Sequence, residues 1–414
     1  LGAKRETAAD VDAAVAAILA DVRARGDAAV IEYTARWDGL TLTPATMRVT
    51  AAEIDAACAA VDAADMAALE TAASRIRAYH DRPRPADARW THAAGASRGW
   101  RWTPVDRAGL YVPGGLASYP SSVLMNAIPA KVAGVGELIV CAPAPGGQIN
   151  PLVLAAARLV GADAVYRIGG AQAIAALAFG TAVIPAVDKI TGPGNAYVAA
   201  AKRQVYGRVG IDMIAGPSEV LVIADGTADP DWIALDLLAQ AEHDESAQSI
   251  LITPDRALAR AAAAALERHL ATLPRAAIAR PSWEAHGAVI TVRDLDEAAV
   301  LADRIAAEHL ELLVDDPEPL AARIRHAGAI FLGHWTPEAI GDYVGGPNHV
   351  LPTARSARHA SGLSVIDFMK RTTLARMTPA ALAAVGPAAE RLAAAEGLHA
   401  HGASVAARRA RLNG

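Results

Sequence analysis

The feature that most constrains this chain of 414 residues is the alternation of short apolar runs with helix-forming stretches from residue 109 onwards. A first series of apolar runs comprises GELIVCAPAP, AVYRIGG and KITGPG, and a second comprises EVLVIAD, SILITPD, GAVITV, LELLVDD and GAIFLG. Strands that alternate with helices are typical of βαβ units and parallel sheets. The sequence therefore predicts two α/β units, which also agrees with a length beyond that of a single hydrophobic core.

The regions that flank the α/β units have other patterns. Residues 6–80 are rich in alanine and place apolar residues at helical spacing, so this N-terminal part is predicted to be mostly helical. Residues 81–108 contain repeated Trp, Gly and Pro, which disfavour a helix and indicate a connection. Residues 363–414 are predicted to add a helical tail.

Composition and charge exclude several classes of partner. The net charge is -5 and the basic residues are dispersed, so no surface for nucleic acid or for an anionic membrane is expected. No segment has the roughly 18 uncharged apolar residues of a membrane span. The two cysteines, Cys58 and Cys141, do not form a disulfide framework or a CxxC site, which favours the cytoplasm. Cys141 is expected to fill core space, since no local His or Lys lowers its pKa.

Glycine-rich turns give a partial indication of nucleotide binding. The fingerprint GxGxxG is absent, because the pair Gly134 and Gly136 follows a helix and precedes a strand. The stretches YRIGGAQAIAALAFG and TGPGNAYVAAAKRQ instead run strand, glycine turn, helix. Backbone N–H groups at such a helix start can bind an anion, although tight turns also use glycine for steric reasons.

Polar side chains gather in four places after residue 236. Gln240 and His243 are three residues apart, so they are either two metal ligands on one helical face or a solvated polar face. Glu308 and His309 precede an apolar strand and are either an acid/base pair or charges at a helix-to-strand junction. The two remaining groups are Asp342, Asn348 and His349 in a glycine-rich loop, and Glu396, His399 and His401 in the tail.

Ten ordered segments together resemble histidinol dehydrogenase across essentially the whole chain. They are GLYVPGG, IGGAQAIAALAFGT, DKITGPGNAYVAAAKR, DMIAGPSEVLVIAD, LLAQAEHDESAQSILIT, EHLEL, FLGHWTPEAIGDY, GPNHVLPT, SGLSVIDFMKRT and the EGLHAH of the tail. The resemblance implies two degenerate Rossmann-like α/β domains without GxGxxG, a helical N-terminal region and a small helical C-terminal dimerisation tail. The implied boundaries are 1–108 plus 216–362 for a discontinuous domain with most site residues, 109–215 for an inserted NAD-binding domain, and 363–414 for the tail.

The resemblance also implies an activity. It is the zinc-dependent oxidation of L-histidinol through L-histidinaldehyde to L-histidine with two NAD+, carried out by a homodimer whose subunits share each site. The implied zinc ligands are Gln240, His243, Asp342 and, from the other subunit, His401. These four residues, with Ser218, His309, His349 and Glu396, would also surround the substrate, while Tyr111, Gln172 and Asn195 would bind NAD+. Glu308 and His309 would be the catalytic acid/base residues.

Departures from the family pattern are small, and rival functions stay open at this point. Ala307 stands where a proline is expected, and Gly345 stands where serine or alanine is common, but neither removes a catalytic group. The rivals are a dehydrogenase of the same fold acting on another alcohol, a zinc hydrolase that uses Glu308, and a non-catalytic NAD-binding protein. Retention of His349, Glu396 and His401 disfavours the first rival.

Overall fold

The computed structural model describes residues 9–92, 95–114, 119–214 and 216–412, which form two compact units. The first unit consists of the described residues up to Pro83 together with Val105–Phe368, and the second contains Arg84–Pro104 and the residues from Met369 onwards. None of the helices in these ranges combines the length and apolar character that a membrane crossing requires.

The first sheet of the larger unit is parallel and has the strand order β5-β4-β3-β6-β7. Its strands are β3 (Arg107–Tyr111), β4 (Glu137–Cys141), β5 (Ala164–Tyr166), β6 (Lys189–Thr191) and β7 (Gly210–Ile211). The connecting helices are α5 (Pro120–Ala133), η1 (Pro145–Gly147), α6 (Pro151–Leu159), α7 (Gly170–Phe179) and α8 (Ala196–Val205). The central strands β3, β4 and β6 are mostly buried on both faces, which explains their apolar runs.

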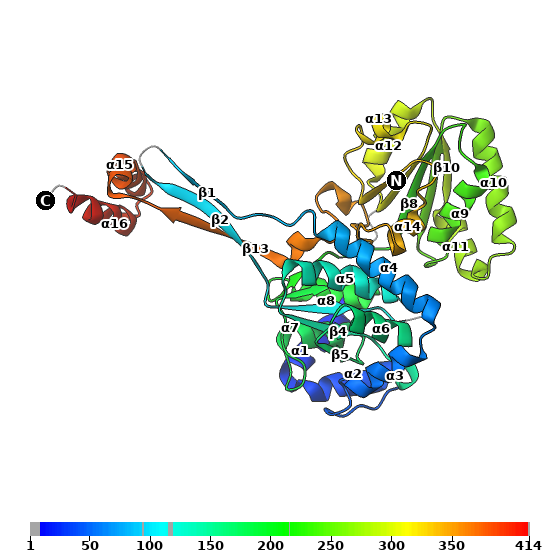
Figure 1. Cartoon of the computed structure of the whole chain (residues 1–414), viewed down its shortest axis with the longest axis horizontal. Coiled ribbons are helices and arrows are strands. Elements are labelled where there is room, and N and C mark those ends of the chain that lie inside the picture. The colour runs from blue at the N-terminus through cyan, green and yellow to red at the C-terminus, as the bar shows by residue number, and fades with distance from the viewer. Residues whose placement is uncertain (1–8, 93–94, 115–118, 215, 413–414) are drawn as a thin grey trace. The chain divides into compact units, whose positions relative to one another are not determined.

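The N-terminal helices pack on the outside of the helices that flank this first sheet. They are α1 (Ala9–Arg25), α2 (Asp27–Asp38), α3 (Ala51–Ala60) and α4 (Ala63–His80), drawn in blue in Figure 1. α1 and α2 contact α7, α3 contacts α6, and α4 contacts α5 and α6. Val15 and Val30 share one hydrophobic core with Ile139 and Ile174. Residues 9–38 thus share a core with residues of the first sheet and its helices. Alanine-rich helical faces pack closely on many apolar surfaces, so their sequence pattern does not indicate which helices they contact. The domain boundaries implied by the resemblance stay a prediction.

The second sheet repeats the topology of the first. Its order is β10-β9-β8-β11-β12, again with parallel pairing. The strands are β8 (Glu219–Ala224), β9 (Gln248–Thr253), β10 (Ala288–Thr291), β11 (His309–Leu313) and β12 (Ala329–Leu332). The helical elements are α9 (Pro230–Ala241), α10 (Arg256–Leu270), α11 (Ala276–His286), α12 (Leu295–Ile305), α13 (Pro317–Ala321), α14 (Glu338–Tyr343), η2 (Ser356–Arg358) and η3 (Val365–Phe368). The predicted α/β class with two Rossmann-like sheets is confirmed.

Each face of the second sheet carries its own core. Val220 and Val222 pack with α9, α10 and α11, while the alternate residues Leu221 and Ile223 pack with α12 and α13. This alternation follows from the period of two along a strand. Helices therefore cover both faces of the sheet, so side chains that bind a ligand have to lie at the strand ends.

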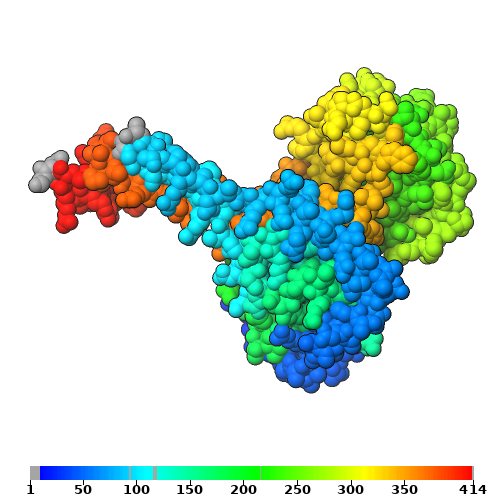
Figure 2. Space-filling model, in the orientation of Figure 1, coloured from blue at the N-terminus to red at the C-terminus, as the bar shows by residue number. Residues whose placement is uncertain are grey.

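The second unit is an antiparallel ribbon followed by two helices. β1 (Ala88–Thr91) pairs with β2 (Ser97–Pro104), which pairs along its whole length with β13 (Met369–Arg376). The helices α15 (Pro379–Ala395) and α16 (His399–Ala410) follow, and Figure 2 shows the cyan strands and the orange to red helices as one surface. The tail was predicted to be helical throughout. β13 was missed because its exposed polar residues have no apolar alternation.

A buried ion pair holds the glycine turn after β6. The Lys202 ammonium and the Asp212 carboxylate contact each other, and their side chains are 2% and 1% exposed. Lys202 Nζ also donates to the carbonyl oxygen of Gly192, while the Gly192 N–H donates to Asp212 Oδ2. Both charged groups thus satisfy the backbone of the TGPGN turn, which connects β6 to α8.

We expect Lys202→Met to lower the free energy of unfolding by about 3–5 kcal/mol, because it leaves the Asp212 carboxylate buried without its cation. Urea unfolding followed by circular dichroism measures this loss. Lys131→Met is the matched control, since the Lys131 and Asp163 side chains are 24% and 42% exposed and such pairs contribute about 1 kcal/mol or less. Equal losses in the two variants would contradict the structural role of the buried pair.

Candidate active site and metal centre

Two strand ends of the second sheet position Glu308 and His309. The backbone N–H of Glu219 donates to Glu308 Oε2 (2.9 Å), and the backbone oxygen of Glu219 accepts from His309 Nδ1 (3.1 Å). A carbonyl oxygen only accepts, so Nδ1 carries a proton. His309 Nε2 has no hydrogen-bond partner among the described residues and lies 3.9 Å from Asp342 Oδ1. The imidazole therefore offers a free basic nitrogen toward Asp342.

Burial sets the ionisation of this pair. The side chains of His309 and Glu308 are only 5% and 8% exposed. Burial lowers the pKa of His309 to about 4 and raises the pKa of Glu308 well above its usual value. His309 is thus neutral near pH 7, and Glu308 is a stronger base than an ordinary carboxylate. Such a pair can accept protons from a bound substrate and from water.

The predicted metal ligands His243 and Asp342 converge on one point. α9 begins at Pro230 after the capping residue Asp229 and ends at Ala241, so Gln240 lies in its last turn and His243 just beyond. His243 Nε2 is 4.0 Å from Asp342 Oδ2, and α14, which carries Asp342, packs on α9. Zinc binds nitrogen and oxygen donors at about 2.0–2.2 Å, so one ion can bridge atoms at that separation.

Gln240 is also suited to bind a metal ion at this position. Its side chain is completely buried, and neither its amide oxygen nor its amide nitrogen has a hydrogen-bond partner among the described residues. A buried amide without partners costs free energy. A cation that accepts the oxygen as a ligand would remove part of that cost, so the donor set of Gln240, His243 and Asp342 suits a zinc ion.

His349 joins the cluster from the loop after α14. Its Nδ1 donates to the backbone oxygen of Asp342 (3.1 Å) and lies 3.7 Å from Asp342 Oδ1, and burial lowers its pKa. The preceding Asn348 fixes the loop, because its side chain donates to the backbone oxygen of Met125 and accepts from the Val350 N–H. Asp342 thus lies in α14 and not in the glycine-rich loop expected from the sequence, but that loop does bring His349 to Asp342.

Three acidic residues of the cluster were missed from the sequence. Glu338 Oε1 is 3.8 Å from His309 Nδ1, and the Glu338 N–H donates to Glu311 Oε1. Asp236 lies close enough to Glu311 for the two carboxyl groups to affect each other's pKa. Burial raises the pKa of Glu338 and Glu311 well above the usual range, and that of Asp236 to about 6. The four-residue spacing of Glu338 and Asp342 was the signal available for the first of these residues.

The predicted cofactor residues lie at the carboxyl ends of strands in the first sheet. Tyr111 ends β3, and its hydroxyl accepts from the Gly170 N–H (3.0 Å); burial raises its pKa to about 12. Gln172 is buried in α7, and its Oε1 has no partner among the described residues. Asn195 caps α8 by accepting from the N–H groups of Tyr197 and Val198. Tyr111 and Gln172 thus meet at the Gly170 turn, where β5 leads into α7 and ligands of open α/β sheets bind.

Three other predicted site residues have no described interaction with the cluster around His309 and Asp342. Ser218 precedes β8, and its backbone oxygen accepts from the Gln248 N–H. Glu396 and His401 belong to the second unit, where both are exposed and line a hollow between α15 and α16. Their place in a complete site is a prediction about the assembled protein.

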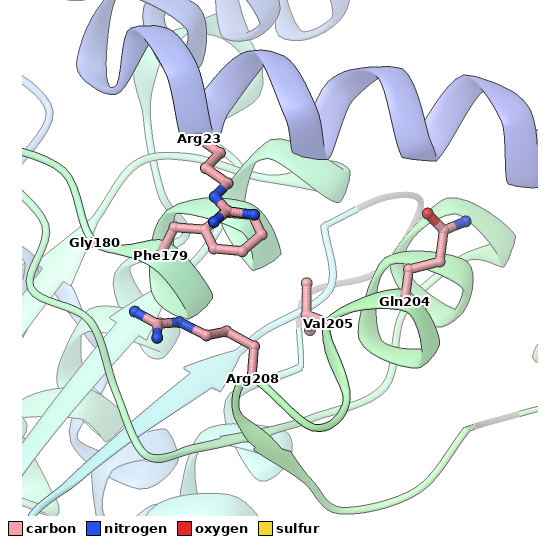
Figure 3. Close-up of a pocket in the computed structure, with 6 residues that line it drawn as sticks. All are labelled: Arg23, Phe179, Gly180, Gln204, Val205 and Arg208. Carbon is pink, nitrogen blue, oxygen red and sulfur yellow. The ribbon is translucent and has the colours of Figure 1, made fainter.

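A hollow elsewhere in the first unit has a different character (Figure 3). It is lined by Arg23, Phe179, Gly180, Gln204, Val205 and Arg208, near the carboxyl ends of α1, α7 and α8. Arg23 lies over the Phe179 ring, and cations at helix carboxyl ends are favoured by the helix dipole. The hollow contains no carboxylate or imidazole, so it offers no acid/base pair.

Cys141 is excluded as a nucleophile. It is completely buried in the core of the first sheet, and burial raises the pKa of its thiol far above the usual value. The reactive form of cysteine is the thiolate, which this environment suppresses. The expectation that Cys141 fills core space is confirmed.

Comparison with known proteins identifies the family. The model of the histidinol dehydrogenase family matches residues 2–409. A histidinol dehydrogenase from Cereibacter sphaeroides is 75% identical over 413 residues, covering 100% of this chain and 95% of the relative. One from Ruegeria pomeroyi is 71% identical, covering 100% of this chain and 96% of the relative. The crystal structure of histidinol dehydrogenase from Elizabethkingia anophelis superposes with a TM-score of 0.96 at 38% identity, covering 100% of this chain and 95% of that one.

The family match, the close relatives and the superposition all extend over nearly the entire length of the chain. They agree with an acid/base pair beside side chains that could bind a metal, and with a separate glycine turn that could bind a nucleotide. The chain therefore belongs to the histidinol dehydrogenase family, a family of NAD-dependent oxidoreductases.

Proposed function

We propose that this protein oxidises L-histidinol through L-histidinaldehyde to L-histidine, with two NAD+ as hydride acceptors. The observation that carries the proposal is the neutral, buried His309, whose free Nε2 faces Asp342 and which lies beside Glu308. An alcohol oxidation needs a base for the hydroxyl proton, and an aldehyde oxidation needs a base for water. The pair supplies both bases within one site. The cytoplasmic location inferred from the cysteine content remains a prediction.

Zinc would be held by Gln240, His243, Asp342 and His401 of a second chain. When bound, it would anchor the imidazole and the amine of histidinol, both of which are zinc donors, and thereby orient the carbinol carbon. The unpartnered Gln240 amide and the 4.0 Å separation of His243 Nε2 from Asp342 Oδ2 support this assignment. His349, Ser218 and Glu396 of a second chain would contact the substrate around this anchor.

NAD+ would be held by Tyr111, Gln172 and Asn195 and would accept the hydride in each oxidation. The hydrogen bond from the Gly170 N–H keeps the Tyr111 ring against the glycine turn. Asn195 Oδ1 already accepts two backbone bonds, which leaves its amide group to donate. The unpartnered Oε1 of Gln172 supplies an acceptor. These groups would orient the dinucleotide with respect to the substrate.

In the first oxidation, His309 Nε2 would take the hydroxyl proton of histidinol as hydride leaves the carbinol carbon. The bond from Nδ1 to the Glu219 carbonyl oxygen holds the required tautomer and ring orientation. Burial keeps the imidazole neutral, so the base form is present without prior deprotonation. The aldehyde product would stay in the site.

In the second oxidation, Glu308 would accept a proton from the water that adds to the aldehyde. His309 would then take a hydroxyl proton of the hydrate as the second hydride leaves. The Glu219 N–H holds Glu308 Oε2, and burial makes this carboxylate more basic than a solvated one. Over the two oxidations, one histidinol, two NAD+ and one water are converted to one histidine, two NADH and three protons.

We expect two NADH per L-histidinol consumed, measured by absorbance with limiting substrate. Chelation should abolish NADH formation, and returned Zn2+ should restore it, because the anchor for the imidazole and amine depends on the metal. The control is the same protein in the same buffer without chelator. One NADH per histidinol with release of free aldehyde would contradict the role given to Glu308.

We expect His309→Asn to lower kcat for both L-histidinol and L-histidinaldehyde by about 100-fold or more, since each oxidation needs this base. Glu308→Gln should affect aldehyde oxidation by a similar factor and leave single-turnover NADH formation from histidinol largely intact. His359→Asn, an exposed histidine outside the cluster, is the matched control. The assignment fails if His309→Asn retains the kcat of the control.

We expect a mixture of His401→Ala and His309→Asn proteins to recover activity that neither has alone. A heterodimer would contain one site with both His309 and the His401 of the other chain. The measurement is NADH formation after mixing, with subunit exchange verified by mass spectrometry of tagged chains. Exchange without any recovery would show that His401 does not serve the neighbouring site.

A further inference from the structure

Two consecutive residues of the loop after His349 have a left-handed backbone. The φ angles of Ala354 and Arg355 are 51° and 64°, and neither residue is glycine. A left-handed conformation costs a residue with a Cβ about 1–2 kcal/mol, so it persists only where the surrounding structure fixes it. The hydrogen bonds that fix this turn therefore indicate which part of the protein depends on it.

The turn is bonded to the segment that leads into β8. The buried Thr353 accepts through Oγ1 from the N–H of Gly216 (2.5 Å), and the Ala354 N–H donates to Glu219 Oε1 (3.0 Å). Gly216 also packs directly on the turn, because a Cβ there would lie 3.1 Å from Thr353 Oγ1 and 3.3 Å from the Ala354 Cβ. The turn thus holds residues on both sides of Ser218.

The loop that contains the turn also packs beside the backbone of Glu308. Gly328, just before β12, lies between Pro352 and Glu308. A Cβ at Gly328 would come 2.5 Å from the Glu308 carbonyl oxygen and 3.1 Å from Pro352 Cδ. The loop and the start of β11 are therefore packed without space for an extra methyl group, and close packing of this kind transmits a displacement.

Glu219 connects the turn to the acid/base pair. Its carboxylate accepts from the Ala354 N–H, its own N–H donates to Glu308 Oε2, and its carbonyl oxygen accepts from His309 Nδ1. Because one residue makes all three bonds, a rotation of its backbone would turn the His309 ring and release Glu308. The turn can therefore act on the reaction without touching the reacting atoms.

We propose that Thr353 is a positioning residue, which fixes Glu219 through the left-handed turn and thereby orients His309 and Glu308. The inference rests on the proposed function for the reaction that this pair catalyses. The loop after α14 would then place His349 directly and the acid/base pair indirectly.

The test compares Thr353→Val with Thr353→Ser. Valine has the shape of threonine but cannot accept a hydrogen bond, whereas serine keeps the acceptor. We expect Thr353→Val to lower kcat for L-histidinol and for L-histidinaldehyde about tenfold or more, because small displacements of catalytic groups cost large factors in rate. The KM for NAD+ should not change, and Thr353→Ser should retain most of kcat.

Thr181→Val is the matched control. Thr181 Oγ1 also accepts from a backbone N–H, that of Ile184 (2.9 Å), but in the loop after α7. A loss of kcat in Thr353→Val no greater than in Thr181→Val would overturn the proposal. Circular dichroism checks folding. If Thr353→Val does not fold, Glu219→Ala takes its place with Glu219→Gln as the conservative variant, and an unchanged kcat in Glu219→Ala overturns the proposal equally.

A measurement without turnover separates this inference from the proposed function. In protein with isotopically labelled histidine, nuclear magnetic resonance should detect the His309 Nδ1–H that the Glu219 carbonyl oxygen holds, assigned by its absence in His309→Asn. We expect this resonance to broaden or disappear in Thr353→Val and to persist in Thr181→Val. An unchanged resonance in Thr353→Val overturns the proposal.

The two failures then have different signatures. If the unmodified protein forms no NADH from L-histidinol but Thr353→Val loses the His309 resonance, only the proposed substrate is removed. If the unmodified protein forms NADH and Thr353→Val keeps both kcat and the resonance, only the positioning role of Thr353 is removed.

Discussion

The site depends on one backbone unit, that of Glu219 at the start of β8. Its N–H holds Glu308 and its carbonyl oxygen holds His309, so the two side chains are oriented by the same residue of a neighbouring strand. This arrangement is possible because β8 and β11 are parallel and paired in the register that sets His309 opposite Val220. A shift of one residue would move His309 to the other face of the sheet. The geometry of the acid/base pair is thus a consequence of strand pairing.

The two sheets have the same strand order, but the residues proposed to bind ligands lie at the carboxyl ends of strands in the first sheet and at the amino ends of strands in the second. Tyr111 and the Gly170 turn lie at carboxyl ends of strands, where helices such as α7 begin and their dipoles favour anions such as the phosphates of the proposed dinucleotide. Glu308 and His309 lie at the amino end of β11, near the carboxyl end of α9 that carries Gln240. The carboxyl end of a helix favours positive charge, which suits a cation. Helix direction would therefore separate the proposed anion site from the proposed cation site within a repeated topology.

Much of the fold was predictable because strands buried on both faces are continuous apolar runs bounded by glycine, as in EVLVIAD and the segment that ends at Gly170. The ribbon of β2 and β13 was not predictable, since exposed strands such as β13 (Met369–Arg376) have no apolar alternation and pair with strands far away in the sequence. In the site, the sequence alone indicated possible metal ligands from the spacing of Gln240 and His243, and a possible acid/base pair from the adjacency of Glu308 and His309. Glu338 and Glu311 were missed because their role depends on α14 meeting β11, which is a tertiary contact.

The pairing of β2 with β13 also has a consequence for the order of folding. The two strands are separated in sequence by both α/β sheets, so the ribbon cannot close until the chain as far as Arg376 has been synthesised. Contacts of such long sequence separation form slowly, because the entropy of closing the intervening loop is lost before the contact is gained. The helices that carry Glu396 and His401 follow β13 directly. The unit expected to complete another chain's site is therefore the last part of its own chain to acquire its structure.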